Sequence, residues 1–214
     1  MVHQKQTLDA DSRPCAKPGA VLLETDRLLI RRFLMSDAPG LSAALNHEEV
    51  IIQLSNRFQY PFTPADAEAA ISLSFPLQHD SDITAAYPRS VALCIKPKTT
   101  DNPSHEPRLI GSMIAHAGEN MSYRTWSIGY AITPEVWGRG YATEALIAFS
   151  DWLLETWPRI ARLEGNTFST NGASAKVLLK AGFTEEGVRR SAVEKNGVLL
   201  DTRQFARLKA DVTS

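Results

Sequence analysis

A β-strand, a loop with two glycines and an amphipathic helix follow one another from Ser127 to Leu154, and no other stretch constrains the fold as strongly. Large and small apolar residues alternate from Trp126 to Ile132, which is the period-two pattern of a strand. Thr133-Pro134 ends the strand, and residues 137–140 read Trp-Gly-Arg-Gly. A helical pattern starts at Tyr141, with one apolar face made of Tyr141, Ala145, Leu146, Phe149, Trp152 and Leu153. The acids Glu144, Asp151 and Glu155 fall on the other face.

The junction between this strand and this helix has the properties of an anion site. The first amides of a helix have no acceptor inside it, and the helix dipole favours negative charge there. Gly138 and Gly140 carry no side chain that would block a phosphate, and they permit positive φ. Arg139 adds a positive charge and Thr143 a hydroxyl. From these residues alone a second interpretation stays open, in which the loop is a tight turn with a solvated arginine.

The bulk properties indicate one globular domain. The chain has 214 residues, and its 43% hydrophobic and 22% charged fractions are ordinary for a protein with a sizeable core. The net charge of −1 gives no sign of nucleic acid or of an anionic membrane surface as a partner. No apolar run is long enough to span a bilayer, so no membrane association is expected.

The ends and the cysteines refine this assignment. Residues 1–22 are polar, contain Pro14 and Pro18, and lack the apolar core of a secretory signal, so we expect a disordered tail before a single domain at 23–210. Cys15 and Cys94 form no CxxC pair and indicate no disulfide framework. A reducing compartment, and hence a cytoplasmic location, is expected.

The order of the predicted elements indicates the fold class. Strands are expected at 24–33, 90–96, 109–117, 126–132, 161–168, 183–190 and 198–208. Helices are expected to start at 36–37, at 63–64, at 141 and at 169–171, the second of them reaching about residue 79. A polar connection with three prolines spans 97–107. Short turns between successive strands imply antiparallel pairing, so the layout is α/β (α+β), with helices packed on a mixed sheet.

Four segments in the right order resemble one family. Residues 137–145, WGRGYATEA, resemble the acyl-CoA pyrophosphate loop of GNAT-superfamily N-acetyltransferases. Residues 25–31, TDRLLIR, resemble the opening strand of the branch that contains the ribosomal-protein N-terminal acetyltransferases RimJ and RimL. Residues 171–183 resemble its Asn-x-x-Ser helix and Leu-x-Lys-x-Gly-Phe ending, and 197–206 its last hairpin. The likeness covers residues 23–208 and implies a mostly antiparallel sheet of six to seven strands with helices on both faces.

The resemblance implies acetyl transfer from acetyl-CoA to a primary amine by direct attack, without a metal. The residues it assigns to the coenzyme are Ile132, Thr133, Trp137, Gly138, Arg139, Gly140, Tyr141, Ala142, Thr143 and Asn171. It makes Ser174 the candidate acid near the sulfur, and Asn171 a contact to pantetheine or substrate. The edge of the strand around 130–133 is expected to pair with the pantetheine amides. A structural alternative is that Asn171 caps a helix and Ser174 lies in its first turn.

The chain departs from the family pattern at three positions. Glu135 stands where the superfamily has Gln or Arg, Ser127 where many relatives carry a Glu, and Leu178 where other branches place a Tyr acid. The residue Ser127 therefore gives no simple base, and either another residue serves as the base or none is needed. Glu164, on the predicted strand 161–168, is the first candidate, and His116 and Glu119 are the others.

The acceptor is expected to be a peptide N-terminus or a small-molecule amine. An α-amine titrates near ~8 and a lysine near ~10.4, so at neutral pH about a tenth of the former but under about 0.1% of the latter is neutral. Lack of an obvious base therefore favours the α-amine. Phe58, Tyr60 and Phe62 either line the acceptor pocket or belong to the core, and the protein is expected to be a monomer or a homodimer.

Three other functions compete with this hypothesis. A Rossmann dinucleotide site requires a third glycine where the chain has Thr143, and too little chain follows for such a domain. A non-catalytic acyl-CoA-binding module is suggested by Ser127 and Glu135. The third competing function is that of a protein–protein adaptor on the same fold.

Overall fold

The computed structural model of the protein describes residues 17–75, 89–97 and 106–211. Cys15, most of the predicted tail and most of the connection at 97–107 lie outside these residues. The helix expected to reach about residue 79 ends earlier, at Ser72, because residues 73–75 form a turn. The first strand begins at Val21, two residues before the predicted domain boundary.

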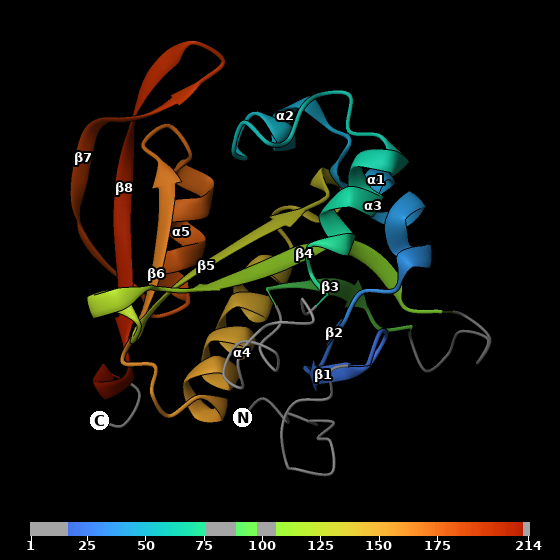
Figure 1. The fold of residues 1–214 in the computed structure, drawn as a ribbon, viewed down its shortest axis with the longest axis horizontal. Helices are drawn as coiled ribbons and strands as arrows, with labels where there is room; N and C mark the ends of the chain where they lie inside the picture. Colours follow the sequence, from blue (N-terminus) through green and yellow to red (C-terminus); the bar gives the residue numbers. More distant parts are fainter. Residues whose placement is uncertain (1–16, 76–88, 98–105, 212–214) are drawn as a thin grey trace.

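One sheet organises the chain (Figure 1). Its strands are β1 (Val21–Glu24), β2 (Leu28–Arg31), β3 (Ser90–Ile95), β4 (Arg108–Ala117), β5 (Thr125–Ile132), β6 (Arg162–Phe168), β7 (Thr184–Lys195) and β8 (Val198–Leu208). They lie in the order β1-β2-β3-β4-β5-β6-β8-β7. All neighbours are antiparallel except β5 and β6, which are parallel. The predicted mixed, mostly antiparallel sheet is therefore confirmed.

The sheet has eight strands rather than the predicted six to seven, because residues 24–33 do not form one strand. Thr25 makes a turn between β1 and β2: its N–H donates to the carbonyl of Leu28 at 3.0 Å. Its hydroxyl accepts from the Leu28 amide at 2.9 Å. Hydrogen bonds between a threonine side chain and nearby backbone groups favour a turn over a continuous strand, and residues 25–28 form the turn.

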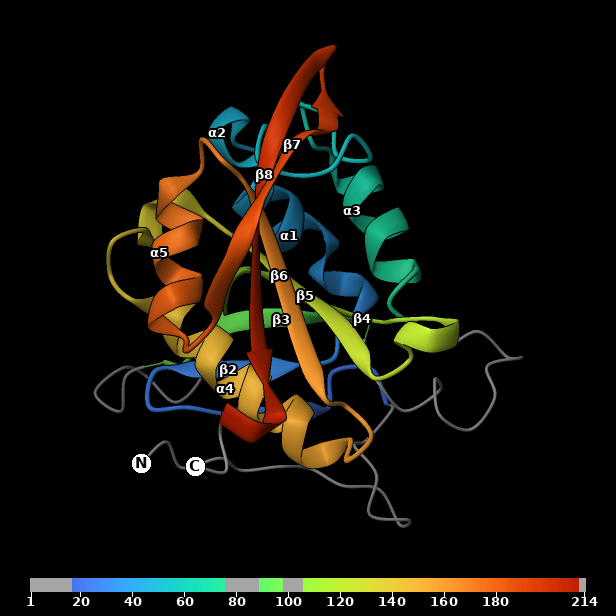
Figure 2. The same ribbon diagram turned by 90° about the vertical axis from the view of Figure 1, so that its left-hand side faces the viewer.

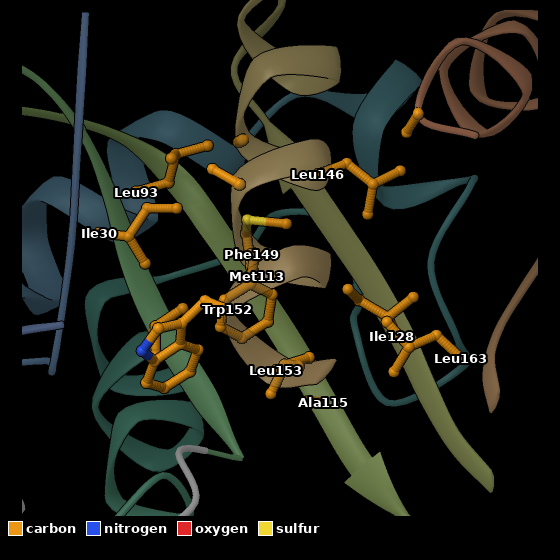
Figure 3. Close-up of a cluster of buried hydrophobic side chains, with 14 of the residues drawn as sticks. Ile30, Leu93, Met113, Ala115, Ile128, Leu146, Phe149, Trp152, Leu153 and Leu163 are labelled. Carbon is orange, nitrogen blue, oxygen red and sulfur yellow. The ribbon is translucent and has the colours of Figure 1, made fainter. Parts of the chain in front are cut away.

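Helices cover both faces, as predicted (Figures 1 and 2). They are α1 (Ala38–Leu45), α2 (Glu48–Ile51), α3 (Pro64–Ser72), α4 (Tyr141–Thr156) and α5 (Gly172–Lys180). The core beneath α4 and α5 includes Leu146, Phe149 and Trp152 of α4, packed against strand residues such as Met113 and Ile128 (Figure 3). The first three helices cover a second core on the opposite face. No helix in the described ranges has the length and apolar character needed to cross a membrane.

The parallel pair β5–β6 is short, and this shapes the site. Only Thr125–Ser127 pair with Arg162–Glu164, although β5 continues to Ile132 and β6 to Phe168. Strand residues alternate between faces. Ile128 and Leu163 face the core beneath α4 and α5, so Ser127 and Glu164 face the opposite side.

Candidate active site

The glycine loop has the backbone that its sequence predicts. Gly138 and Gly140 adopt φ of 73° and 79°, in the left-handed region where glycine carries no steric cost. A short 3-10 helix, Pro134–Val136, joins β5 to this loop, and α4 begins at Tyr141, where the helical pattern begins in the sequence.

The amides of the loop are available to a ligand. The first helical bond of α4 runs from the Glu144 N–H to the Gly140 carbonyl, at 3.0 Å. In the part of the chain that the structure describes, no protein group accepts from the amides of residues 138–143. A Cβ added to Gly138 would meet no atom within 4 Å, so the space in front of this residue is open. These donors at a helix N-terminus form an anion site, which we call the amide cup (residues 138–143).

Arg27 supports the backbone of the amide cup. Its Nη1 donates to the carbonyl of Arg139 at 2.9 Å, and its guanidinium lies 4.3 Å from the centre of the Tyr141 ring. Its Nε donates at 2.6 Å to Glu144, whose carboxylate also accepts from the Arg27 amide and the Thr25 hydroxyl. The turn between β1 and β2 is thereby fixed to the first turn of α4. Two of the segments that resemble the family, residues 25–31 and 137–145, are therefore in contact here.

We expect Arg27→Met to weaken coenzyme A binding roughly 3- to 10-fold, because the loop loses two of its supports while its own amides remain. Turnover at saturating acetyl-CoA should stay close to wild type. Titration calorimetry with coenzyme A and steady-state rates measure the two quantities. Arg190→Met, at an exposed position on β7, is the matched control. A drop in turnover with unchanged affinity would contradict the positioning role.

The negative charge of Glu135 is balanced by a neighbouring arginine. Its carboxylate is ion-paired with Arg108 at the start of β4. The acid at this departure from the superfamily pattern therefore does not add an uncompensated negative charge beside the cup.

Beyond Ser127, the edge of β5 that faces β6 has no strand paired with it. The Thr133 N–H donates to the carbonyl of Ile110 at 2.8 Å. Because the N–H and C=O groups of successive strand residues point to opposite sides, those of odd-numbered residues in β5 point toward β4 and those of even-numbered residues point toward the β6 side. Tyr130 and the N–H of Ile132 thus lie on an open edge, while the Ile132 carbonyl accepts from the Trp137 indole at 3.0 Å. Thr133, which was predicted to contact the coenzyme, is buried, and its carbonyl accepts from the Val136 amide. Its backbone groups are used within the protein.

The start of α5 brings two hydroxyls together. Asn171 caps the helix, accepting from the Ser174 amide at 3.0 Å, as the structural alternative predicts. The Ser174 Oγ in turn accepts from the Tyr130 hydroxyl at 3.2 Å. Burial raises the pKa of Tyr130, and the hydrogen bond to Ser174 offsets part of that rise, so the phenol stays protonated. The position of the Tyr acid of other branches is filled by Leu178, which is buried against Gly165.

The sequence predicts a role for the backbone of Tyr130 but not for its side chain. The alternation of β5 was the available signal, since it places Tyr130 on the same face as Trp126 and Ile128. Only the fold shows that α5, forty-four positions further along, brings Ser174 to it.

A polar row lies on the opposite face. His116 of β4 is the register partner of Ser127, and Ser127 is that of Glu164, so the three side chains are neighbours across three strands. The Glu164 carboxylate accepts from the Nε of Arg162 at 2.8 Å. Burial, followed by the positive charges of Arg89 and Arg57, lowers the pKa of His116. Glu119 lies in the turn after β4 and is not part of this row.

The aromatic residues before α3 have different places. Phe62 is buried and its ring lies 5.6 Å from that of Phe58, so both belong to the second core. Tyr60 is exposed. Trp126 and Trp152 are core residues, as predicted. No group of three or more His, Cys, Asp or Glu residues within 17–75, 89–97 and 106–211 could hold a metal ion.

An amide cup for a diphosphate, continued by an open strand edge and by a pair of hydroxyls, has the layout of a site for a long coenzyme with an anionic end. The class that these features and the motifs define is that of acyl-CoA-dependent transferases. Comparison with known proteins agrees, since residues 27–184 match the acetyltransferase (GNAT) domain. The chain belongs to the acetyltransferase (GNAT) family, and the predicted acetyl transfer from acetyl-CoA to an amine is confirmed as its activity.

Relatives of known sequence and structure support this assignment. The uncharacterized N-acetyltransferase YoaA of Bacillus subtilis is 30% identical over 190 residues, which cover 88% of this chain and 97% of YoaA. The structure of Mycobacterium smegmatis RimJ in complex with CoA-disulfide is similar with a TM-score of 0.68 and 19% identity, over 87% of this chain and 84% of RimJ. The ribosomal alpha-N-protein acetyltransferase RimL in complex with coenzyme A has a TM-score of 0.67 and 20% identity, over 86% and 95% of the two chains. At this level of identity the likeness to these two shows a shared fold, and the RimJ/RimL-like branch stays a prediction.

Proposed function

We propose that the acceptor is a primary amine of low pKa, above all the α-amine of a peptide, and that it enters from the face opposite the coenzyme. The observation that carries this proposal is the division of the site. The amide cup and the Tyr130–Ser174 pair lie on the side of α4 and α5, and the polar row His116–Ser127–Glu164 lies on the other. The two sides meet where β5 and β6 part.

The coenzyme side takes the following roles. The amide cup holds the diphosphate, with Arg139 as a charged partner. The open edge of β5 pairs with the pantetheine amides, and its N–H groups at Tyr130 and Ile132 are the candidate oxyanion donors. Ser174, assisted by the Tyr130 hydroxyl, protonates the sulfur as the C–S bond breaks. Asn171 positions Ser174 by capping α5.

The acceptor side needs only a weak base. As the amine nitrogen bonds to the acetyl carbon, its proton passes to the polar row, directly or through water. Glu164 lies at the last position before β5 and β6 part, but its carboxylate is engaged by Arg162. His116 contributes a neutral imidazole at neutral pH, because its pKa is lowered. Such weakly basic side chains suit an acceptor amine of which a part is already unprotonated at neutral pH. RimL, one of the structural relatives, is described as an α-N-protein acetyltransferase, which supports the same acceptor class.

Two matched peptides test the proposal. One carries a free N-terminus and no lysine, and the other is N-acetylated and carries one lysine. Initial rates of thiol release from acetyl-CoA at pH near 7 should give a kcat/KM about 10²-fold higher for the free N-terminus, which is the ratio of the neutral fractions. Equal rates for the two peptides would refute the preference for an α-amine.

The pH dependence should separate the members of the polar row. For a peptide acceptor, kcat/KM should fall with a slope of one below pH ~8, as the α-amine is protonated. Because the pKa of His116 is lowered, its imidazole stays neutral to a pH below its ordinary ~6.5, and only there should the slope steepen. His116→Gln should remove the steeper segment, while Glu164→Gln should keep it. A wild-type profile with a single slope would exclude His116 as a proton acceptor.

A further inference from the structure

A pocket opens on the acceptor side, between the end of α2, the end of β6 and the tip of the β7–β8 hairpin. It has a volume of about 240 Å³. Ile52, Phe168 and Leu200 contribute apolar wall, and Lys195 is the single charged residue among the described residues that line it. Two contacts close one side, from the Asn56 side chain to the Glu194 carbonyl at 3.0 Å and from the Lys195 Nζ to the Ser55 carbonyl at 3.5 Å. Figures 1 and 2 both show α2 and the tip of this hairpin at the same end of the molecule.

Lys195 is poorly satisfied for a buried charge. The residue is only 5% exposed, and its ammonium has three donors but one long contact, to a neutral carbonyl. No carboxylate of residues 17–75, 89–97 and 106–211 forms an ion pair with it. Burial lowers its pKa, as expected for an ammonium without a counter-charge. A carboxylate from a ligand would supply the missing partner.

The charges nearby favour an acidic ligand. Arg57 and Arg89 lie close enough to His116 to lower its pKa, so the polar row has positive charge beside it. A single guanidinium, that of Arg162, pairs with both Glu164 and Glu186, so these three side chains together carry one net negative charge. The positive charges that favour an acidic ligand on this side are therefore those of Arg57 and Lys195.

The spacing along β6 sets how far the negative group lies from the amine. Phe168, in the pocket wall, follows Glu164, the last residue paired with β5, by four positions on the same face of the strand. At ~3.3 Å per residue this separation is about 13 Å. An extended peptide covers that distance in about four residues. A free amino acid, whose carboxylate is attached to the carbon that bears the amine, is too short to reach both places.

We propose that this pocket binds an acidic side chain three to five residues from the N-terminus of a peptide acceptor, with Lys195 pairing its carboxylate. This inference rests on the proposed function, since it assumes that the α-amine lies where β5 and β6 part. It adds a requirement that the acetyl-transfer chemistry itself does not impose.

A set of peptides in which one Glu moves from the second to the sixth position of an otherwise neutral sequence tests the proposal, each against its Gln counterpart. The Glu peptide should have the higher kcat/KM by about 10- to 100-fold at the favoured positions, the range expected for a hydrogen-bonded charge pair. Lys195→Met should abolish that ratio, and Lys195→Arg should keep part of it. Lys180→Met, at the exposed end of α5, should leave it unchanged. Coenzyme A binding by calorimetry shows that each variant is folded.

The outcomes distinguish the inference from the proposed function. A wild-type profile without dependence on the position of Glu, or a ratio that survives Lys195→Met, would overturn the inference while peptide acetylation still stands. Equilibrium binding of the N-acetylated product peptides covers the remaining case. If no peptide is acetylated but the Glu peptides bind in a Lys195-dependent way, the pocket is confirmed and the acceptor assignment fails. If the Glu peptides neither react nor bind, both fail.

Discussion

Replacing Ser174 by alanine is expected to lower kcat by about 10² to 10⁴-fold, the range for loss of a positioned general acid. The physical reason is that the thiolate of coenzyme A would leave without the donor that α5 holds at its first turn. Fold and coenzyme binding should change little, because the cap bond of Asn171 uses the backbone amide of Ser174 and not its hydroxyl. Thiol release at saturating acetyl-CoA and acceptor measures the effect.

Two further variants show whether the effect is specific to this hydroxyl. Ser72→Ala removes another helical serine hydroxyl, bonded to the Glu68 carbonyl at 2.8 Å and far from the site, and should leave kcat unchanged. Tyr130→Phe removes the donor to Ser174 and should lower kcat less than Ser174→Ala does. The double variant should be little worse than Ser174→Ala, since the two hydroxyls act as one unit. A kcat for Ser174→Ala within a few-fold of wild type would remove Ser174 from the role of acid.

The second large effect is expected at the amide cup, where Gly138→Ala should weaken coenzyme A binding by about 10- to 100-fold. A Cβ at this position enters open space, so no protein atom opposes it, but that space is the one assigned to the diphosphate. The displaced phosphate would lose one or more charge-assisted hydrogen bonds, worth about 1.5–3 kcal/mol each. Calorimetry with coenzyme A measures the loss.

Gly197→Ala is the matched control for this variant. Gly197 has φ of 81° and, like Gly138, open space where a Cβ would lie, but it belongs to the β7–β8 turn. Both alanines carry the cost of the left-handed region, about 1–2 kcal/mol of stability, so both should lower the melting temperature similarly. Only Gly138→Ala should affect the coenzyme. Equal affinities for coenzyme A in the two variants would contradict the placement of the diphosphate.

Local patterns sufficed for the elements whose signal lies within a few residues. The glycine loop and the start of α4 follow from positions 137–141, and the cap at Thr63 follows from the threonine and the acid three residues on. The prediction of one strand at 24–33 was wrong because Thr25 is compatible with both a strand and a turn. The turn is stabilised by Glu144, more than a hundred residues away in the sequence.

The parts of the site that depend on tertiary contacts were less accessible. Sequence alone put Glu144 on the polar face of its helix, but the structure shows it half-buried against Arg27. The Tyr130 hydroxyl became visible as a partner of Ser174 only once β5 and α5 were placed together. Conversely, Thr133 was assigned to the coenzyme from its position in the motif, and the ladder with β4 takes up its N–H. The roles of Glu164, Asn171 and Ser174 stay predictions, of which Glu164→Gln and Ser174→Ala test the first and the last.

The shortness of the β5–β6 ladder has a mechanical consequence. The ladder between the half of the sheet that ends at β5 and the half that begins with β6 has three residue pairs, and the carbonyl of Arg124 extends this seam by accepting from the amides of Ala161 and Arg162. Helix α4 is the covalent bridge across that seam, and its buried side chains pack on strands from both halves. A pantetheine chain lying in the gap would extend the seam by strand-like bonds of its own. The cosubstrate would then link the two halves while it is bound, and its release after transfer would leave them joined by the short ladder, helix α4 and the core.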